Sequence, residues 1–490
     1  MEYIAAFDIG TTAIKGALVT HDWQIAHTES LEIETIFSDG FIEQSPKQWY
    51  ERFCLIANIF TSQVGPDKIT GIVMSGQMQD LILMDKSGDP LQNAILYSDA
   101  RAGSQVERID GLLEIATVES ITGNPLDGSI PFAKLLWIKE NSPEILSQTH
   151  KIGISSKDFV LARLCGEFVT DVTSASTSGL MDLSLKQWRT DWLEIFGISP
   201  KVLPRLCTAQ EEVGRLHQRA AAETGFAAGT PVYAGTGDAG ATTLASGISK
   251  PGECNINLGT SGWVATVSKN VLSQKGVFNL AAMPADLLVN VVPFINAGNV
   301  HKWICSTLAP DNMQDAKYIY GTALLEESSP GSHGLFCLPY LAGERFPVVN
   351  PTIKGAFVGL TIETTKQDII RAALEGVAYS IRNGLDSLEV TPLSVSLIGG
   401  GARSSAWCQM LADILNSSIK VYRDAEFAPI LAIAASALIS QNIISSYYDF
   451  IDLRKSDCTV YHPFEQNVKY YQCAYREYLQ LYPAIKSFFG

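Results

Sequence analysis

The sequence predicts an α/β fold of two large domains that enclose a central cleft. With 490 residues, the chain is too long to form one hydrophobic core. A strand-like apolar run at residues 3–7 leads through Gly10-Thr11-Thr12 into a second run at 14–19. The same order of strand, small polar turn and strand returns at residues 253–267. Because this unit recurs about 250 residues later, we expect two similar halves, each with such a hairpin.

The first hairpin has the features of a phosphate-binding turn. Gly10 lets the backbone approach a bulky anion, and the hydroxyls of Thr11 and Thr12 can donate hydrogen bonds to phosphate oxygens. Asp8 precedes the turn, where a carboxylate can hold hydrated Mg²⁺ beside the phosphates, and Lys15 can offset phosphate charge. Taken alone, the motif is also compatible with an ordinary Gly-Thr hairpin that carries a surface lysine.

Strands and helices alternate through the rest of the first half. An amphipathic pattern with a proline in its first turn predicts a helix at 46–60. Strand-like runs surround it at 24–29, 70–74, 81–84 and 94–97. Helical patterns dominate from 105 to 196. The first half is therefore a strand-rich start followed by a helical stretch.

Two polar loops of the first half are candidate ligand contacts. Gln77, Met78 and Gln79 follow directly after the strand at 70–74, and polar side chains at a strand's end commonly line ligand clefts. A solvated loop is the alternative. Asp99 and Arg101 could hydrogen-bond a polyol, and a surface ion pair is the alternative for them.

Asp238 is the carboxylate with the most informative surroundings. It follows a strand-like run at 229–234, lies in the glycine-rich segment Gly235-Thr-Gly-Asp-Ala-Gly, and precedes a helix of small residues at 239–246. Backbone amides and the helix dipole at that position are expected to favour the ionised form. An ionised carboxylate in a cleft can accept a hydroxyl proton and aim the oxygen at a phosphorus atom. A plain helix N-cap is the alternative.

The second half repeats the pattern after Gly and Pro residues at 247–252 mark a boundary. Its hairpin turn is Gly259-Thr260-Ser261, a strong amphipathic helix is expected at 366–388, and an apolar strand at 394–398 ends in Gly399-Gly400-Gly401. A strand, a glycine-rich turn and a helix suit close approach of adenine or ribose, although the dinucleotide-binding spacing is missing. A tight turn without a ligand is the alternative.

Composition excludes several functional classes. The net charge of −15 argues against nucleic acid or anionic membrane as a partner. Nine cysteines without a Cys-x-x-Cys pair predict reduced thiols in the cytoplasm, and seven histidines show no metal-ligand spacing. The most apolar stretch, 427–439, is too short to span a bilayer and predicts a buried helix. Met1 runs directly into a strand, so no signal peptide is expected.

These motifs together resemble the FGGY carbohydrate kinases, a family of the actin-like and sugar-kinase ATPase group. The two hairpins resemble the family's two phosphate loops, and the turn at 399–404 resembles its adenosine-binding turn. Two long signatures fit in the right order: Ser-Ile-Pro-Phe-Ala-Lys-Leu-Leu-Trp at 129–137, and Gly-Ala-Phe-Val-Gly-Leu at 355–360 followed by Asp-Ile-Ile-Arg-Ala-Ala-Leu-Glu at 368–375. The resemblance covers essentially the whole chain.

The resemblance implies a fold, two substrates and a set of site residues. The fold is α/β, with two actin-like domains of mixed sheets flanked by helices; residues 1–247 mainly bind sugar and residues 248–490 mainly bind ATP. Asp238 is the catalytic base, and Asp8 and Asp238 organise Mg²⁺. The implied sugar contacts are Gln77, Met78, Gln79, Asp99, Arg101, Asp238 and Ala239. The implied ATP contacts are Gly10, Thr11, Thr12, Lys15, Gly259, Thr260, Ser261, Gly400, Gly401 and Ala402. A homodimer is a possible assembly.

Within the family, the chain looks most similar to xylulokinases, with departures near the sugar. Gln79 stands where those proteins have a histidine, Ala239 where they have an asparagine, and Phe-Pro-Val-Val at 346–349 where they have a Thr-Pro-His-Asn type of run. The resemblance implies ATP-dependent phosphorylation of a pentulose such as D-xylulose to its 5-phosphate. The alternatives are a kinase for gluconate, ribulose or a related ketose, and a non-kinase ATPase of the same fold.

Overall fold

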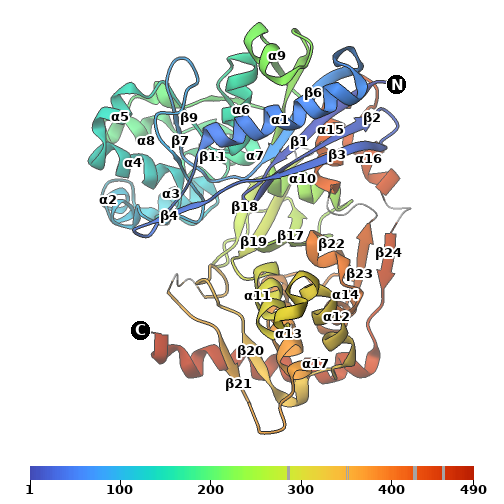
Figure 1. Ribbon diagram of the computed structural model, residues 1–490. Helices are drawn as coiled ribbons and strands as arrows, with labels where there is room; N and C mark the ends of the chain where they lie inside the picture. The colour runs from blue at the N-terminus through green and yellow to red at the C-terminus, as the bar shows by residue number, and fades with distance from the viewer. Residues whose placement is uncertain (284–286, 349, 351, 423–426, 455–457, 490) are drawn as a thin grey trace. The chain divides into compact units, whose positions relative to one another are not determined.

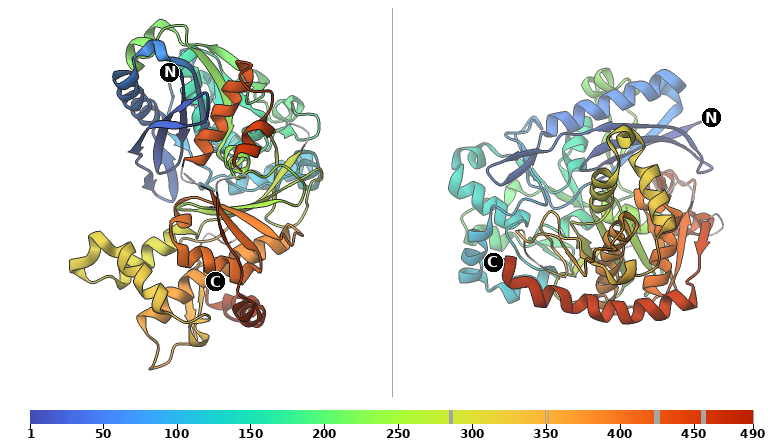
Figure 2. Two further views of the ribbon diagram at one scale, coloured as in Figure 1. Left: turned by 90° about the vertical axis from the view of Figure 1, so that its right-hand side faces the viewer. Right: turned by 60° about the horizontal axis from the view of Figure 1, so that its bottom comes forward.

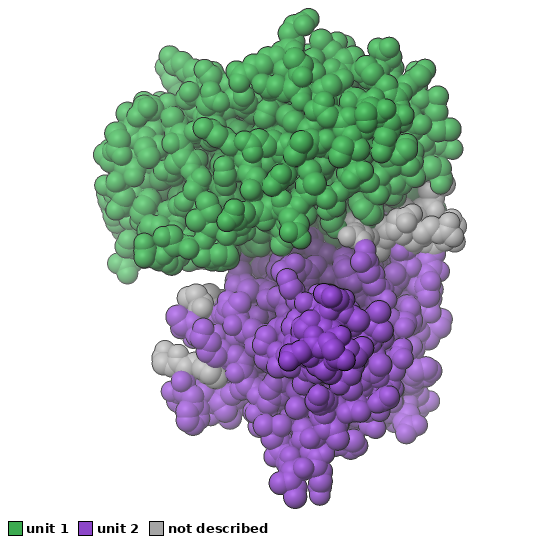
Figure 3. Space-filling view, in the orientation of Figure 1, with its two compact units in different colours: residues 1–245, 278–289, 427–452 green, residues 246–277, 290–426, 453–490 purple. Residues whose placement is uncertain are grey.

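The computed structural model describes residues 1–283, 287–348, 350, 352–422, 427–454 and 458–489 (Figure 1). The chain divides into two compact units, coloured separately in Figure 3. Unit 1 comprises Met1–Ala245, Phe278–Val289 and Phe427–Asp452, and unit 2 comprises Ser246–Val277, Asn290–Glu426 and Leu453–Gly490. Two segments from the second half of the sequence therefore belong to the unit that contains the N-terminus.

A mixed six-stranded sheet forms the centre of unit 1. Its strands, in spatial order, are β14 (Glu212–Arg215), β15 (Pro231–Gly237), β6 (Ile69–Gly76), β1 (Tyr3–Ile9), β2 (Ala13–Thr20) and β3 (Ile25–Glu32). The central strands β1, β6 and β15 are parallel to one another. β2 pairs antiparallel with β1, β3 with β2, and β14 with β15. The three parallel strands end at the same edge, which places the residues that follow them close together.

Helices cover the sheet of unit 1 (Figures 1 and 2). α1 (Pro46–Val64) packs on β2 and β3 through buried side chains spaced three or four residues apart, including Trp49, Phe53, Ile56 and Phe60. α10 (Asp238–Ala245) and α15 (Ala428–Ser440) pack on each other, and both contact β6. The helix predicted from the apolar stretch at 427–439 is confirmed as α15, which is buried on nearly every side.

A second mixed sheet is built mainly from unit 2. Its order is β18 (Phe278–Ala281), β19 (Leu288–Phe294), β17 (Gly262–Ser268), β16 (Cys254–Leu258), β22 (Ser394–Ile398), β23 (Ser418–Tyr422) and β24 (Cys458–Tyr461). β18 and the first two residues of β19 belong to the segment Phe278–Val289 of unit 1. β16, β22 and β23 are parallel, and β17 and β24 pair antiparallel. α13 (Lys366–Ser387), α14 (Ser405–Leu415) and α17 (Glu465–Ile485) share one hydrophobic core with these strands. The predicted α/β fold with mixed sheets flanked by helices is confirmed.

Shorter elements complete both units. The remaining strands are β4 (Ile36–Ser38), β5 (Phe41–Gln44), β7 (Ile82–Met84), β8 (Ala94–Ile95), β9 (Lys151–Gly153), β10 (Val169–Asp171), β11 (Met181–Asp182), β12 (Gln187–Trp188), β13 (Arg205–Cys207), β20 (Phe336–Leu338) and β21 (Ala356–Val358). The remaining α-helices are α2 (Gly103–Leu113), α3 (Ile115–Thr122), α4 (Pro131–Asn141), α5 (Pro143–Gln148), α6 (Ser156–Cys165), α7 (Val172–Ala175), α8 (Thr190–Ile195), α9 (Gln218–Thr224), α11 (Gly298–Leu308), α12 (Lys317–Glu327) and α16 (Tyr447–Arg454).

Candidate active site

The ends of β1, β6 and β15 bring two carboxyl groups together in unit 1. Asp8 of β1 lies opposite Ser75 of β6, and Thr236 of β15 lies on the other side of Ser75. The Ser75 hydroxyl donates a hydrogen bond of 2.7 Å to Asp8 Oδ1. Asp238 is the first residue of α10, directly after β15, and its Oδ1 accepts a bond of 2.7 Å from the amide of Ala239. The three parallel strands thus gather the residues that the sequence predicted as base and metal ligand.

Burial changes the acid strength of both carboxyl groups. Part of the Asp238 residue is accessible to solvent, but its carboxyl lies deep among protein atoms. Burial and, to a smaller degree, the negative charge of Asp8 together raise the pKa of Asp238 to about 7, against the hydrogen bond from the Ala239 amide. Burial also raises the pKa of Asp8, against the hydrogen bond from Ser75 and the charge of Lys15. The prediction that local amides would favour an ionised Asp238 is wrong in its net result, because desolvation outweighs one amide bond.

This raised pKa has a consequence for stability. Below about pH 4 the Asp238 carboxyl is neutral in the folded and the unfolded chain. Above about pH 4 the unfolded chain ionises Asp238 freely, whereas the folded protein keeps the buried carboxyl neutral until the pH approaches 7. The free energy of unfolding therefore falls as the pH rises, and the stability that the buried carboxyl contributes is lost by about pH 7. We expect Asp238→Asn to be more stable than wild type at pH 8, by about 2 kcal/mol once partial exposure is allowed for, and equally stable near pH 4. Thermal unfolding without nucleotide or metal measures this; a variant less stable at pH 8 would contradict it.

Some of the hydrogen-bonding groups in the first predicted phosphate turn already bind other parts of the protein. The Gly10 amide donates to the Ala13 carbonyl at 3.2 Å, and the Thr11 hydroxyl donates to Gln77 Oε1 at 2.7 Å. Thr12 is exposed and Lys15 is partly exposed, opposite Asp8 in the β1–β2 pairing. The structure therefore joins the phosphate turn to the loop after β6 through Thr11 and Gln77.

The loop after β6 lies against the strand that carries Asp238. A Cβ atom on Gly237 would lie 2.3 Å from the Met78 sulfur, so Met78 packs directly against this glycine. Gln79 is buried in a left-handed backbone conformation with φ 65°, and its Nε2 donates to Ser129 Oγ at 2.8 Å. Few residues other than glycine adopt this backbone conformation, and those that do often lie at functional sites. The structure thus brings Met78 against the residue that precedes Asp238, the predicted base.

Asp99 and Arg101 form a closed, buried pair. The two carboxylate oxygens of Asp99 accept from Arg101 Nε at 2.9 Å and Nη2 at 2.6 Å, and Arg101 Nη2 also donates to Glu43 Oε1 at 2.8 Å. The guanidinium lies 3.8 Å from the centre of the Phe41 ring. Burial would raise the pKa of Asp99, yet bonds from Arg101 and the Ile42 amide hold it below its usual value. The alternative of a surface ion pair is wrong, because both side chains are buried.

The predicted nucleotide-binding turns meet at one end of the unit 2 sheet. Gly259 and Thr260 accept bonds of 2.9 Å from the amides of Gly298 and Asn299, at the start of α11. Gly399 has φ 95°, and a Cβ there would lie 2.6 Å from the backbone of Leu258, so only glycine fits between the strands. Gly400 faces open space within 4 Å of its Cβ position. An exposed glycine on a packed turn suits the approach of a flat ligand.

Sequence reasoning missed two contributors to these sites. Ser75 orients Asp8 through a hydrogen bond. In the sequence, only its position just before Gly76 at the end of a strand could have indicated this role. Gly298 allows the close approach of α11 to the second hairpin, since a Cβ there would lie 2.3 Å from the Gly259 carbonyl oxygen. Neither residue has a motif of its own, so both became visible only when distant segments were placed together.

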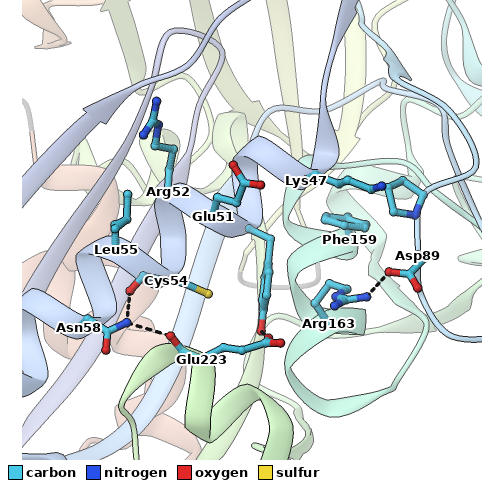
Figure 4. Close-up of a pocket in the computed structure, with 12 residues that line it drawn as sticks. Lys47, Glu51, Arg52, Cys54, Leu55, Asn58, Asp89, Phe159, Arg163 and Glu223 are labelled. Atoms are coloured by element: carbon cyan, nitrogen blue, oxygen red, sulfur yellow. Dashed lines mark hydrogen bonds and ion pairs between the residues drawn. The ribbon is translucent and has the colours of Figure 1, made fainter.

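A cavity of about 560 Å³ lies elsewhere in unit 1, between α1, α6 and α9 (Figure 4). None of the predicted site residues line it. Some of its polar groups are bonded to one another: the Tyr50 hydroxyl donates to Glu223 at 2.6 Å, and Arg163 pairs with Asp89.

Neither a cluster of metal-binding side chains nor a membrane-spanning helix is found in the part of the chain that the structure describes. Across the described residues, no group of three or more His, Cys, Asp or Glu side chains is arranged to hold a metal ion. In the same part of the chain, none of the helices has the length and apolar character needed to cross a bilayer. All nine cysteines are free in the structure.

Comparison with known proteins defines the class and then the family. The N-terminal domain of the FGGY family of carbohydrate kinases matches residues 3–245, and its C-terminal domain matches residues 254–438. The fold and the two matched regions make this chain a carbohydrate kinase of the actin-like ATPase group. It belongs to the FGGY family.

Relatives of two substrate types are almost equally similar. The xylulose kinase of Bacillus subtilis is 29% identical over 502 residues, covering 99% of this chain and 98% of that protein. The gluconokinase of the same organism is 31% identical over 432 residues, covering 86% of this chain and 84% of that protein. A solved ligand-bound xylulose kinase from Lactobacillus acidophilus has a TM-score of 0.90 at 26% identity, with 100% of this chain and 99% of that chain covered. Similarity therefore establishes a sugar kinase and leaves the sugar open.

Proposed function

We propose that the protein transfers the γ-phosphoryl group of ATP to a terminal hydroxyl of a five-carbon ketose, with D-xylulose to its 5-phosphate as the reference reaction. The observation that carries this proposal is the Asp238 carboxyl, whose pKa is raised to about 7 by burial and which lies next to Asp8 and to the Met78 loop. A base with a pKa near neutrality is well matched to hydroxyl activation. The resemblance to xylulokinases supports a pentulose as the acceptor.

The residues of unit 1 account for the acceptor half of the reaction. Asp238 takes the proton of the attacking hydroxyl as its oxygen forms a bond to the γ-phosphorus, and ADP leaves with the electrons of the broken P–O bond. Gln77, Met78 and Gln79 orient the sugar, and Ala239 borders it. We retain Asp99 and Arg101 as support for this pocket, because their polar groups bind each other. Exclusion of water prevents hydrolysis of the γ-phosphate.

The remaining predicted residues serve the nucleotide. Gly259, Thr260 and Ser261 of the second hairpin hold phosphate, and Gly400, Gly401 and Ala402 border the adenosine. Gly10, Thr11, Thr12 and Lys15 hold phosphate from the first hairpin. The division of labour between residues 1–247 for sugar and 248–490 for ATP remains part of this proposal, as do a cytoplasmic location and a homodimer.

Mg²⁺ fits the carboxyl pair of unit 1. Asp8 and Asp238 are hard oxygen donors whose charges repel each other and whose burial is unfavourable, so a divalent cation would relieve both effects. Two carboxylates complete a magnesium site only with phosphate oxygens and water, as is usual for this ion. When bound, Mg²⁺ would neutralise phosphate charge.

An acceptor panel tests the proposed function. ADP release should be measured with pentuloses, hexuloses, polyols and sugar acids, gluconate and ribulose among them. We expect release to depend on the added acceptor and to be fastest with a pentulose. ADP release that is independent of any acceptor would indicate a non-kinase ATPase of this fold. A clear preference for gluconate would favour the second candidate function, which the gluconokinase relatives support.

The pocket residues that depart from xylulokinases should tune the choice of sugar. Gln79 keeps a hydrogen-bonding side chain, but its Nε2 already donates a hydrogen bond to Ser129 Oγ. Ala239, next to the proposed base, has no side-chain donor. Sites that hydrogen-bond a hydroxyl discriminate strongly against acceptors that leave those groups unpaired. We expect weak activity of the wild type on D-xylulose and a shift toward it in Gln79→His/Ala239→Asn. The ratio of kcat/KM values for D-xylulose and the best panel acceptor measures this; fast wild-type turnover of D-xylulose with no gain in the variant would contradict it.

A further inference from the structure

A fully buried lysine joins the proposed sugar loop to a second loop of unit 1. Lys134 of α4 has no exposed surface. Its Nζ donates to the carbonyl oxygen of Gln79 at 3.1 Å and to that of Leu96 at 2.7 Å. One ammonium group therefore holds the backbone of residue 79, after β6, and the backbone of residue 96, after β8.

Asp80 connects the same two segments from the other side. It is fully buried, its amide donates to Ile154 O at 3.0 Å, and its Oδ1 accepts from the Tyr97 amide at 3.1 Å. Its second oxygen, Oδ2, has no hydrogen-bond partner among the residues that the structure describes. Burial raises the pKa of Asp80 well above its usual value, even against the charge of Lys134, so the neutral carboxyl is favoured. A buried ammonium group and a buried carboxyl thus link segments 79–80 and 96–97 through hydrogen bonds.

The conformation of Gln79 shows what this link has to maintain. Gln79 keeps φ 65°, a conformation that costs free energy for a residue with a side chain and persists only where its surroundings enforce it. The bond from Lys134 to the Gln79 carbonyl is one such constraint, and the bond from Gln79 to Ser129 is another. Met78, one residue earlier, packs against Gly237, which precedes the base. A relaxed Gln79 would therefore displace groups that border Asp238.

We propose that Lys134 and Asp80 are positioning residues that hold the Met78–Gln79 loop in the geometry needed for the sugar, an inference that rests on the sugar-binding role proposed above. Neither residue acts on the substrate. Their function is to fix the backbone from which Met78 and Gln79 contact it. A misplacement of about 1 Å in such a group can cost about 100-fold in rate.

Two single variants and their combination separate positioning from folding. Lys134→Met should lower the midpoint of thermal unfolding, because it removes the hydrogen bonds to the buried carbonyl oxygens of Gln79 and Leu96, whereas Asp80→Asn keeps an acceptor for the Tyr97 amide and should lower it less. Lys134→Met/Asp80→Asn removes both ionisable groups, so a loss of activity in it cannot come from an uncompensated buried charge. In this double variant we still expect kcat/KM for the sugar to be about 10- to 100-fold below wild type, with KM for ATP within about twofold. A folded double variant with wild-type kcat/KM for the sugar would overturn the proposal.

Lys139→Met is the matched control. Lys139 lies on the same helix and its Nζ also binds two backbone carbonyls, those of Phe196 and Gly197, away from the sugar loop. We expect this variant to keep the sugar kcat/KM of wild type. An equal loss in Lys139→Met would show that any loosening of α4 suffices and would overturn a specific role for Lys134.

A second measurement does not depend on catalysis. Hydrogen–deuterium exchange at the amides of Asp80 and Tyr97 should be faster in Lys134→Met and unchanged in Lys139→Met. If wild type phosphorylates no acceptor on the panel, the proposed function fails, and exchange alone then decides the positioning role. Unchanged exchange at 77–80 and 96–99 in Lys134→Met would overturn it, and faster exchange confined to those segments would support it.

Discussion

Replacing Asp238 with asparagine is expected to reduce sugar-dependent ADP formation by about 10²- to 10⁴-fold, while ATP still binds. Asparagine has nearly the same shape and can still accept the bond from the Ala239 amide, which is 2.7 Å long in wild type. It cannot take a proton from a hydroxyl. Steady-state ADP release with the best acceptor measures the loss, and equilibrium binding of ATP to the variant shows that the nucleotide site is intact.

The control for Asp238 is a carboxylate whose role is confined to a helix start. Asp449, in the first turn of α16, accepts hydrogen bonds from the amides of Ser445 and Ser446. Asp449→Asn should leave activity unchanged. If Asp238→Asn also stays within a few-fold of wild type, then Asp238 is a helix cap as well and the assignment of the base is wrong. If Asp238→Asn is both less active and more stable than wild type at pH 8, then burial of the Asp238 carboxyl serves catalysis at a cost in stability.

Local patterns predicted those parts of the fold that depend on local sequence. The hairpins, the amphipathic helices α1 and α13 and the buried helix α15 each have a periodicity or a turn chemistry that identifies them. The membership of residues 278–289 and 427–452 in unit 1 has no such signal. It depends on contacts such as those of α15 with β1 and β6, which join positions more than 300 residues apart.

The candidate site shows the same limit in its electrostatics. Residue types and their places near strand ends were enough to propose Asp8 as a metal ligand and Asp238 as a base, and the family resemblance implied that both organise Mg²⁺. The protonation preference of Asp238 was predicted with the wrong sign, because it depends on how many atoms from distant segments bury the carboxyl. The burial of the Asp99–Arg101 ion pair was equally hidden, since Glu43 and Phe41, which contact Arg101, come from a separate hairpin.

The other large effect is expected at Asp8. Asp8→Asn keeps an acceptor for the Ser75 hydroxyl but removes the negative charge beside Asp238. Removing one of two carboxylates should weaken Mg²⁺ binding, and loss even of an outer-shell partner typically costs about 10- to 100-fold in metal affinity. We therefore expect the Mg²⁺ concentration for half-maximal activity to rise by at least about tenfold, measured by titration at fixed ATP and acceptor.

A second variant separates the charge of Asp8 from its orientation. Ser75→Ala removes the 2.7 Å bond to Asp8 Oδ1 and leaves the charge in place. Its Mg²⁺ requirement should rise less than that of Asp8→Asn, because an ionised Asp8 still attracts the cation.

The pKa of Asp238 should also fall in Asp8→Asn, since the neighbouring negative charge that raises it is gone. Activity that declines at low pH should then persist to lower pH in Asp8→Asn at saturating Mg²⁺. Titration curves for Mg²⁺ that coincide with those of wild type would place the metal elsewhere and leave Asp8 as a neighbour that only tunes the base.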